Sequence, residues 1–285
     1  LTKIGQVRRL ALEGHAATVS LRLTLCKNLP ARYHRDSMLP SERLLSRLDH
    51  HLDALDQLDF SDPVAAVYNP LRYARAMWEL YLRRFGNAHR EVLVLGMNPG
   101  PWGMAQTGIP FGEVGAVRDW MGLAARIGHP EHEHPKRPVE GLNCRRSEVS
   151  GRRLWGLFRE RFGAPQAFFD RHLVINYCPL VFMGETGRNI TPDKLSRGER
   201  SELFAICDAM LAETLAAYRP KWLVGVGAFA TARLSGFAAD DSATSGGPRL
   251  VQVLHPSPAS PAANRGWAEQ ASRQLEAAGV WEPAS

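Results

Sequence analysis

Residues 92–104 read VLVLGMNPGPWGM, an apolar run that ends in a loop of glycine and proline. Its first four residues show no polar alternation, which is typical of a parallel strand covered on both faces. Three further runs of this kind follow at residues 173–175, 222–226 and 250–254. Helical patterns separate the runs, and this alternation predicts an α/β fold with three α/β/α layers and a four-stranded parallel sheet.

Helices are predicted from apolar residues that recur every three or four positions and from residues that favour helix ends. The first helix is predicted to begin with Ser41 as its cap. A long helix is predicted over residues 192–218, with Thr191 as its cap and Pro192 at its first position. The other helices are predicted at residues 71–84, 114–127, 151–162, 228–234 and 264–278.

The 285 residues are 45% hydrophobic and 22% charged, which is the composition of a globular protein. We interpret residues 41–285 as one catalytic domain and residues 1–40 as a basic, poorly ordered extension. Residues 1–37 hold seven Lys or Arg and two acids, a balance of +5 out of a net charge of +6. The global charge therefore says little about the partners of the domain itself.

The four cysteines lie far apart, and no C-x-x-C pair occurs. This spacing argues against a zinc ribbon, an iron–sulfur site and a disulfide scaffold. No apolar run approaches the roughly eighteen residues that a membrane-spanning helix needs. The sequence therefore predicts an intracellular protein without a membrane partner, in the cytoplasm and nucleoid of a bacterium or in the nucleus of a eukaryote.

Polar side chains follow three of the four runs, at the point where each run ends. Asn98 lies in the loop after the first run, Asn176 comes directly after the second, and His255 follows the fourth. The carboxyl ends of parallel strands meet at one edge of a sheet, where ligands bind. Each residue alone has a plainer explanation, as a turn, a strand end or a structural histidine. Together they predict a site that orients water and hydrogen-bonds a planar polar ring.

The loop after the first run contains five glycines and three prolines between residues 96 and 112. Such a composition gives a rigid path on which the backbone can come close to a ligand. Phe111 lies on this loop and not in a helical stripe, so its ring is a candidate for stacking on a ligand. Ordinary core packing is the alternative explanation for Phe111.

Three segments resemble the single-strand-selective monofunctional uracil-DNA glycosylases: GMNPGPWGMAQTGIPFGEV at 96–114, NYCPL at 176–180 and HPSPASPAANRGW at 255–267. The resemblance covers roughly residues 60–280 and implies a uracil-DNA glycosylase-like fold. It also implies a monomeric enzyme that flips uracil, and 5-hydroxymethyluracil, out of single- or double-stranded DNA. The base would be released hydrolytically, leaving an abasic site without strand cleavage. Shorter matches are HPKRPV at 134–139, SEVSG at 147–151 and GRNITP at 187–192.

The resemblance assigns roles to the residues at the predicted sheet edge. Asn98 would position the water that attacks the sugar C1′, and His255 would donate to uracil O2 as negative charge develops on the base. Asn176 would read the pairing edge, whose donor and acceptor pattern is reversed in cytosine. Phe111 would stack on the flipped ring. The other pocket residues implied are Met97, Gly100 and Met104.

The resemblance further implies two DNA contacts outside the pocket. The stiff loop after His255 would press into the minor groove beside the vacated base, although this chain has Ala259 where relatives often present an arginine. The turn before Thr191 would bind phosphates. The residues implied to contact DNA are Gly187, Arg188, Asn189, Thr191, Lys194, Pro256, Ser257, Pro258, Ala259, Asn264 and Arg265.

No metal or cofactor is expected. The cluster of His129, His132 and His134 has tempting spacing, but its prolines and glutamates favour a solvated loop. No lysine occupies a motif position that would form a Schiff base.

Two other classes of function compete with the glycosylase. Gly225, Gly227 and Ala230 match the G-x-G-x-x-A pattern of a dinucleotide-binding oxidoreductase, although on the third apolar run and not the first. A catalytically silent nucleic-acid-binding module that retains the pocket is the second alternative. The presence of both Asn98 and His255 favours the enzyme.

Overall fold

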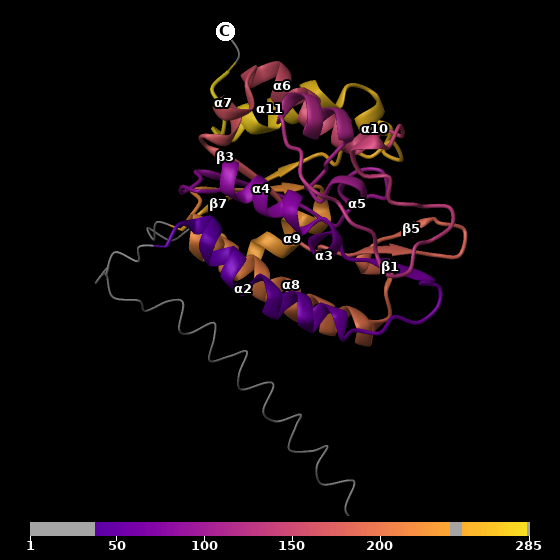
Figure 1. The fold of residues 1–285 in the computed structure, drawn as a ribbon. Coiled ribbons are helices and arrows are strands. Elements are labelled where there is room, and N and C mark those ends of the chain that lie inside the picture. The colour runs from indigo at the N-terminus through magenta and orange to yellow at the C-terminus, as the bar shows by residue number, and fades with distance from the viewer. Residues whose placement is uncertain (1–37, 240–246, 284–285) are drawn as a thin grey trace, which may run out of the picture. The chain divides into compact units, whose positions relative to one another are not determined.

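Four parallel strands form the central sheet in the order β3-β2-β6-β7 (Figure 1). They are β2 (Val92–Gly96), β3 (His172–Asn176), β6 (Trp222–Val226) and β7 (Arg249–Val253). The predicted parallel sheet is confirmed, with strand bounds correct to within one residue. The computed structural model describes residues 38–239 and 247–283, so residues 1–37 of the predicted extension 1–40 lie outside the described residues.

Helices cover both faces of the sheet, as the pattern of the strands predicts. Every residue of β2 and β6 is buried, whereas the edge strand β7 is partly exposed. In Figure 1, α6 (Val149–Phe162) and α11 (Trp267–Ala277) lie on one side of the sheet. On the other side lie α2 (Pro40–Asp56), α8 (Arg197–Tyr218) and α9 (Ala228–Leu234). None of the described helices is long and apolar enough to span a membrane.

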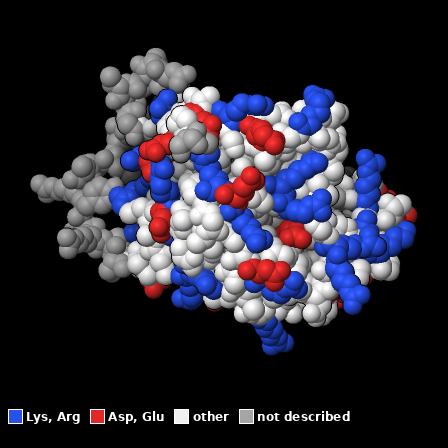
Figure 2. All heavy atoms as spheres, turned by 90° about the horizontal axis from the view of Figure 1, so that it is seen from above, with Lys and Arg blue, Asp and Glu red and all other residues white. Residues whose placement is uncertain are grey.

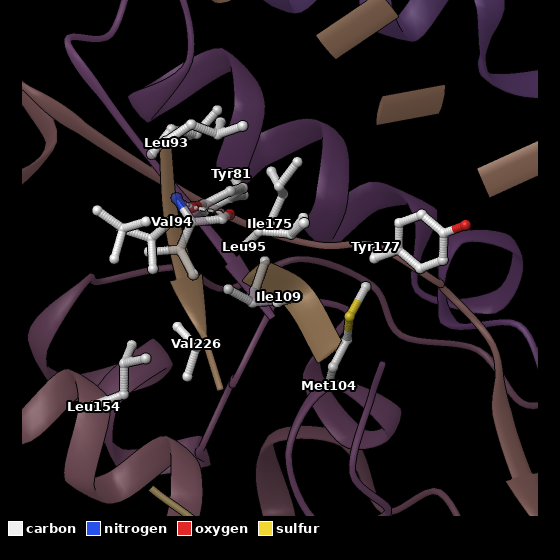
Figure 3. Close-up of a cluster of buried hydrophobic side chains, with 14 of the residues drawn as sticks. Tyr81, Leu93, Val94, Leu95, Met104, Ile109, Leu154, Ile175, Tyr177 and Val226 are labelled. Carbon is white, nitrogen blue, oxygen red and sulfur yellow. Dashed lines mark hydrogen bonds between the residues drawn. The ribbon is translucent and has the colours of Figure 1, made fainter. Parts of the chain in front are cut away.

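The core gathers around β2, where Leu93, Val94 and Leu95 pack among side chains from the neighbouring elements (Figure 3). Tyr81 of α4 (Arg75–Phe85) is fully buried there, and its hydroxyl donates to the carbonyl oxygen of Val174 at 2.9 Å. This bond satisfies the one polar group of the ring in an apolar surrounding. The helix α4 is therefore fixed against the strand that ends in Asn176.

A second, antiparallel sheet was not predicted. It has the order β1-β4-β5 and consists of β1 (Ala66–Tyr68), β4 (Val181–Met183) and β5 (Asn189–Ile190). Strands of two or three residues leave too short a pattern to be recognised in a sequence. The sheet matters for the site because the turn between β4 and β5 carries two of the residues expected to bind DNA.

Two predicted helix caps were wrong. Ser41 lies inside the first turn of α2, where it is buried and its hydroxyl donates to Asn87, while the backbone N–H of Leu39 donates to Glu42. Thr191 precedes only a short 3-10 turn, Pro192–Lys194. The long helix α8 begins at Arg197, and Ser196 caps it by accepting from the backbone N–H of Glu199.

Two predicted helices also differ from the structure. Residues 114–127 contain only one π-helical turn, Ala116–Trp120, after which Gly122 takes a φ of 64° that favours glycine. The last predicted helix is divided because Gly266 has a φ of 102°, which separates α10 (Pro261–Asn264) from α11. Residues 71–84 likewise form two helices, α3 (Pro70–Tyr73) and α4. Local periodicity continued through these breaks, so the sequence pattern did not reveal them.

His172, at the start of β3, makes the stability of the fold depend on pH. Its Nδ1 lies 2.9 Å from the carbonyl oxygen of Phe168, and its Nε2 accepts from the indole N–H of Trp281 at 3.0 Å. A proton on Nε2 would face the Trp281 N–H, and burial lowers the pKa of His172 from 6.5 to about 4. The unfolded chain therefore takes up this proton at a higher pH than the folded chain.

We expect the free energy of unfolding to fall by about 3 kcal/mol as pH drops from 6.5 to 4, because of His172. Chemical denaturation at a series of pH values measures this change. The variant His172→Phe is expected to be less stable at pH 7, since Trp281 loses its acceptor, but to have a flatter pH dependence. An equal pH dependence in the variant and the wild type would contradict the assignment.

Candidate active site

The carboxyl ends of β2 and β3 lie side by side, and their pairing continues into the loops that follow. Gly96 is in register with Asn176. Beyond them, the backbone N–H of Tyr177 donates to Gly96 O and that of Cys178 donates to Met97 O, both at 2.9 Å. The loop of Asn98 is thereby fixed against the loop that follows Asn176. The backbone carbonyl oxygen of Met97, which was expected to line the pocket, is one of the acceptors in this pairing.

Asn176 and Phe111 meet over the backbone of Gly96. A Cβ at Gly96 would lie 2.4 Å from Asn176 Oδ1 and 2.5 Å from Phe111 Cε2. Any side chain at position 96 would therefore push apart the amide and the ring. Phe111 has a φ of 53°, a left-handed conformation that is uncommon for a residue other than glycine. The structure thus brings together the amide expected to read the base and the ring expected to stack on it.

The amide oxygen of Asn176 is buried and has no hydrogen-bond partner among the described residues. The amide nitrogen lies 3.3 Å from the thioether sulfur of Met104, which is a weak acceptor. A buried acceptor without a donor costs free energy, so such groups are rare outside functional sites. Asn176 is therefore prepared to accept a hydrogen bond from a ligand and to donate one.

The side chain of Asn98 is held by its amide nitrogen, which donates to Leu180 O at 3.2 Å. Leu180 belongs to the loop that follows Asn176, so this bond ties the two asparagine loops together. Within the described part of the chain, no donor approaches the amide oxygen of Asn98, and the residue is half-buried. That oxygen is the group with which Asn98 can hold a water molecule.

His255 is arranged as a neutral hydrogen-bond donor. Its Nδ1 lies 3.1 Å from the backbone N–H of Ser257, which donates to it. The proton of the neutral ring must then reside on Nε2. Burial lowers the pKa of His255 below 6.5, which favours the neutral ring at pH 7. The ring centroid lies 6.4 Å from that of Phe111, so His255 belongs to the same cluster.

The loop after His255 is clamped by an arginine that sequence reasoning missed. Arg153 of α6 donates through Nη1 to Pro256 O at 3.1 Å and Ser257 O at 3.3 Å. Its Nη2 donates to Asn264 Oδ1 at 2.8 Å. Asn264, expected to contact DNA, thus has its amide oxygen engaged in holding the loop. Because the Ser257 N–H donates to His255, the clamp also supports the orientation of the imidazole.

The tip of this loop projects to the surface. Pro258 and Ala259 are exposed, and so is Arg265 in the following turn. The loop is stiffened from within, since Asn264 Nδ2 donates to Pro258 O at 2.9 Å and Ser257 Oγ accepts from the Ala259 N–H at 3.2 Å. A rigid exposed tip next to His255 is the arrangement that a wedge into DNA requires.

A buried carboxyl group supports the loop of Gly100 and Met104. A Cβ at Gly100 would lie 2.3 Å from Glu148 Oε2, and one at Gly103 would lie 3.0 Å from the Cγ of Glu148. The backbone N–H of Trp102 donates to the same oxygen at 3.4 Å. Burial raises the pKa of Glu148. The only sequence signal for this residue was its place in the segment SEVSG.

The residues expected to bind phosphate belong to the β4–β5 turn and the segment after it. Gly187 has a φ of 74°, and the Gly184 N–H donates to Arg188 O at 3.0 Å, which closes the turn. Arg188, Asn189, Thr191 and Lys194 line a surface groove of about 760 Å³. The expectation of a helix N-terminus at Thr191 is wrong, so phosphate binding there would depend on Arg188 and Lys194. Lys194 forms an ion pair with Asp193, in which Nζ lies 3.1 Å from Oδ2.

The interpretation of the histidine cluster as a solvated loop is wrong for His134. This side chain is buried, and its Nε2 lies 3.1 Å from Glu185 O in the β4–β5 connection. Its Nδ1 accepts from the Lys136 N–H at 3.1 Å. His129 and His132 are exposed, as expected. The buried side chain of His134 therefore packs against the turn that contains Gly187 and supports it.

Contacts in the structure join some of the expected residues and leave others apart. Asn176, Phe111 and His255 form one cluster around Gly96, and Asn98 is joined to it through the paired loops. A cavity of about 50 Å³ has Asn176 and Met104 on its wall, together with apolar side chains of α2 and α8. Asn98, Phe111 and His255 are not on its wall, so it is not the whole base pocket.

The segment that carries these residues matches a known protein family. Residues 83–276 match the family described as the uracil DNA glycosylase superfamily. The chain belongs to the uracil-DNA glycosylase superfamily. The matched segment contains every side chain of the cluster, from Asn98 to His255. The resemblance seen in the sequence is confirmed.

Three curated members of the uracil-DNA glycosylase superfamily show the likeness in detail. The single-strand selective monofunctional uracil-DNA glycosylase of Rattus norvegicus is 48% identical over 229 residues, which cover 79% of this chain and 80% of the rat protein. The Mus musculus protein of that description is 47% identical over 229 residues, with the same coverage. The Bos taurus protein is 48% identical over 228 residues, covering 80% of this chain and 83% of the relative.

The fold is also similar to that of a solved structure. The structure described as wild-type SMUG2 of Pedobacter heparinus aligns with a TM-score of 0.60, covering 86% of this chain and all of that protein. The sequence identity is 15%, so this likeness concerns the fold alone. It confirms the predicted uracil-DNA glycosylase-like α/β architecture.

Proposed function

We propose that the chain is a monofunctional DNA-repair glycosylase that hydrolyses the N-glycosidic bond of uracil in DNA and leaves an abasic site. Family membership gives the reaction class, and the relatives named above are uracil-DNA glycosylases. The observation that carries the assignment of the site is the unpartnered, buried amide oxygen of Asn176 beside the ring of Phe111. Phe111 offers a ring face on which one flipped base can stack, and Asn176 offers an amide that can hydrogen-bond the pairing edge of the same base.

Base selection follows from the hydrogen-bonding pattern of Asn176. Its Oδ1 accepts from uracil N3–H, and its Nδ2 donates to uracil O4. Cytosine presents an acceptor at N3 and a donor at its amino group, so both contacts become repulsive and buried polar groups stay unpaired. Thr or Ser hydroxyls, which rotate, would not discriminate in this way. A fixed amide therefore suits an enzyme that must ignore normal cytosine.

Hydrolysis combines a held water with stabilisation of the leaving base. The oxygen of a water held by Asn98 Oδ1 forms a bond to C1′ of the sugar and loses a proton to solvent. The C1′–N1 bond breaks, and its electron pair leaves with the uracil. His255 donates its Nε2–H to uracil O2, where negative charge accumulates. This step needs a neutral donor, which is the state that the Ser257 N–H and the burial of the ring impose.

The direct test is release of free uracil from oligonucleotides that contain one deoxyuridine, with EDTA present. We expect uracil in the supernatant and a strand that stays intact until alkali cleaves the abasic site. A matched oligonucleotide with cytosine at that position serves as control and is expected to stay unchanged. Absence of base release, or cutting of the strand by the enzyme itself, would contradict the proposal.

We extend the proposal to 5-hydroxymethyluracil on the basis of the loop from Gly100 to Met104, which we call the pocket loop. This loop contains Met104, whose unbranched thioether adapts to substituents of different size. We expect release of 5-hydroxymethyluracil at a rate within about tenfold of that for uracil, measured on a lesion panel in single- and double-stranded oligonucleotides. Rejection of 5-hydroxymethyluracil together with rapid release of uracil would show that the pocket is closed at C5.

Ala259 allows a separate test of the loop after His255. We expect Ala259→Arg to raise the rate of uracil release from duplex DNA by several-fold and to change the single-strand rate less, because a long side chain at the exposed tip can fill the vacated base position. Ala262→Arg, in α10 three residues beyond the tip, serves as a charge-matched control. An equal gain on both substrates would count against a wedge and favour simple attraction to phosphates.

The alternative of a dinucleotide-binding enzyme has no support in the structure. A Cβ at Gly225 would lie 2.3 Å from the hydroxyl of Thr231, and one at Gly227 would lie 3.0 Å from the Cβ of His255. Close packing between β6, α9 and His255 therefore accounts for both glycines. The matching family and the relatives named above are uracil-DNA glycosylases. The G-x-G-x-x-A pattern is a consequence of packing at this edge of the sheet.

A further inference from the structure

We propose that Trp102, Arg137 and Arg146 form a binding site for the phosphodiester backbone of the DNA strand that enters the base pocket. We call these three residues the Trp102 platform. The inference rests on the proposed function, since it concerns how the strand that carries the target base is held. None of the three residues was among those expected from the sequence to bind DNA.

Two guanidinium groups lie over one indole ring. Arg137 Cζ is 5.0 Å and Arg146 Cζ is 4.6 Å from the Trp102 ring centroid. Trp102 itself is part of the pocket loop between Gly100 and Met104. A guanidinium that rests on an aromatic face keeps the N–H groups at its edge available for an anion, and its planar fork fits a phosphate. The ring thus holds two positive charges next to the pocket loop.

Neither arginine of the platform is neutralised by a carboxylate among the described residues. Arg137 donates through Nη1 to the backbone oxygen of Lys136 at 2.8 Å, and its Nε is buried without a partner. The nearby carboxyl group of Glu148 is buried with a raised pKa and accepts from the Trp102 N–H. Some arginines elsewhere on the surface are paired, such as Arg47 with Glu213 and Arg171 with Glu91.

The platform is continuous with the turn between β4 and β5. A Cβ at Gly187 would lie 3.2 Å from Arg137 Cζ, so this guanidinium packs directly on the turn that carries Arg188. Exposed Lys136 and Arg145 flank the platform in the sequence. Figure 2 shows Lys and Arg side chains outnumbering acidic ones on one face of the molecule, with a group at its right edge. The positive charges therefore form a track from the pocket loop to the turn.

A nucleic-acid strand is the occupant that this chemistry favours. Flipping a base requires that the backbone on both sides of the nucleotide be held while the base leaves the stack. Arginines placed beside the pocket loop can grip the phosphates there. A purely structural role, in which Trp102 and the arginines only stiffen the loop, is the competing explanation. The two differ in how binding depends on salt, because phosphate contacts release counterions.

The test measures binding of a uracil-free single-stranded oligonucleotide by fluorescence anisotropy over a range of NaCl concentrations. For the double variant Arg137→Gln/Arg146→Gln we expect weaker binding and a plot of log Kd against log salt whose slope is lower by about 1.4, or about 0.7 for each arginine. Arg146→Lys keeps its charge and is expected to keep most of the slope. Arg47→Gln removes an arginine of α2 that is already paired with Glu213, and it is expected to leave the slope unchanged.

An unchanged slope in the double variant would overturn the inference, and so would a lowered melting temperature with an unchanged slope, which would indicate structural support only. Uracil release by the wild type is measured in parallel. A wild type that binds DNA with the expected salt dependence and releases no uracil would contradict the proposed function and leave the platform intact. The two failures are therefore distinguishable.

Discussion

Replacing Asn98 by alanine is expected to lower the single-turnover rate of uracil release by about two orders of magnitude or more. The amide nitrogen of Asn98 is fixed on Leu180 O, which leaves its oxygen as the acceptor for the attacking water. Alanine removes that acceptor, so water reaches C1′ without orientation. Rapid-quench kinetics with enzyme in excess over a deoxyuridine oligonucleotide measures the step without interference from product release.

The control for this substitution is Asn143→Ala, which removes the same group from an exposed position. It is expected to retain the wild-type rate. Binding of the oligonucleotide by Asn98→Ala is measured by anisotropy and is expected to stay close to that of the wild type. A rate within a fewfold of wild type in Asn98→Ala would remove this residue from the mechanism.

Replacing His255 by alanine is expected to reduce the rate by about two orders of magnitude as well, because the charge on uracil O2 then develops without a donor. The wild-type rate is expected to stay flat from about pH 7 to about pH 8, since burial lowers the pKa of His255 from its usual 6.5 and so favours the neutral ring. A pH–rate profile under single-turnover conditions provides both measurements.

The two parts of this prediction have different consequences. A rate that rises as pH falls through 7 would mean that an imidazolium acts and not the neutral ring, which conflicts with the hydrogen bond from the Ser257 N–H to Nδ1. His51→Ala serves as the matched control, because His51 pairs with Glu213 between α2 and α8 and is expected to affect stability only. Equal losses in the two histidine variants would point to a loss of folding.

The sheet could be predicted from the sequence, and the candidate site residues proposed from it, for a physical reason. Buried parallel strands require unbroken apolar runs, and polar residues directly after such runs must lie at one edge of the sheet. Asn98, Asn176 and His255 were found in this way. The ring of Phe111 was assigned through the resemblance, and its contact with Gly96 agrees with that role.

Other features depend on contacts between distant segments and left no local pattern. Arg153 clamps a loop about one hundred positions away, and the carboxyl group of Glu148 fills the space above Gly100. The helix cap fell on Ser196 and not on Thr191 because the chain is extended at Leu195, between the 3-10 turn and α8. In these places tertiary packing, and not local sequence preference, determines the structure.

The central claim is that Asn98, Asn176 and His255 act on one flipped base. A crystal structure of Asn98→Ala bound to a deoxyuridine oligonucleotide tests it most directly. The account predicts the uracil ring stacked on Phe111, with Asn176 Oδ1 within hydrogen-bond distance of N3 and His255 Nε2 within that distance of O2. A uracil that remains stacked in the strand would contradict the account. So would a uracil that occupies a different pocket while the variant is inactive.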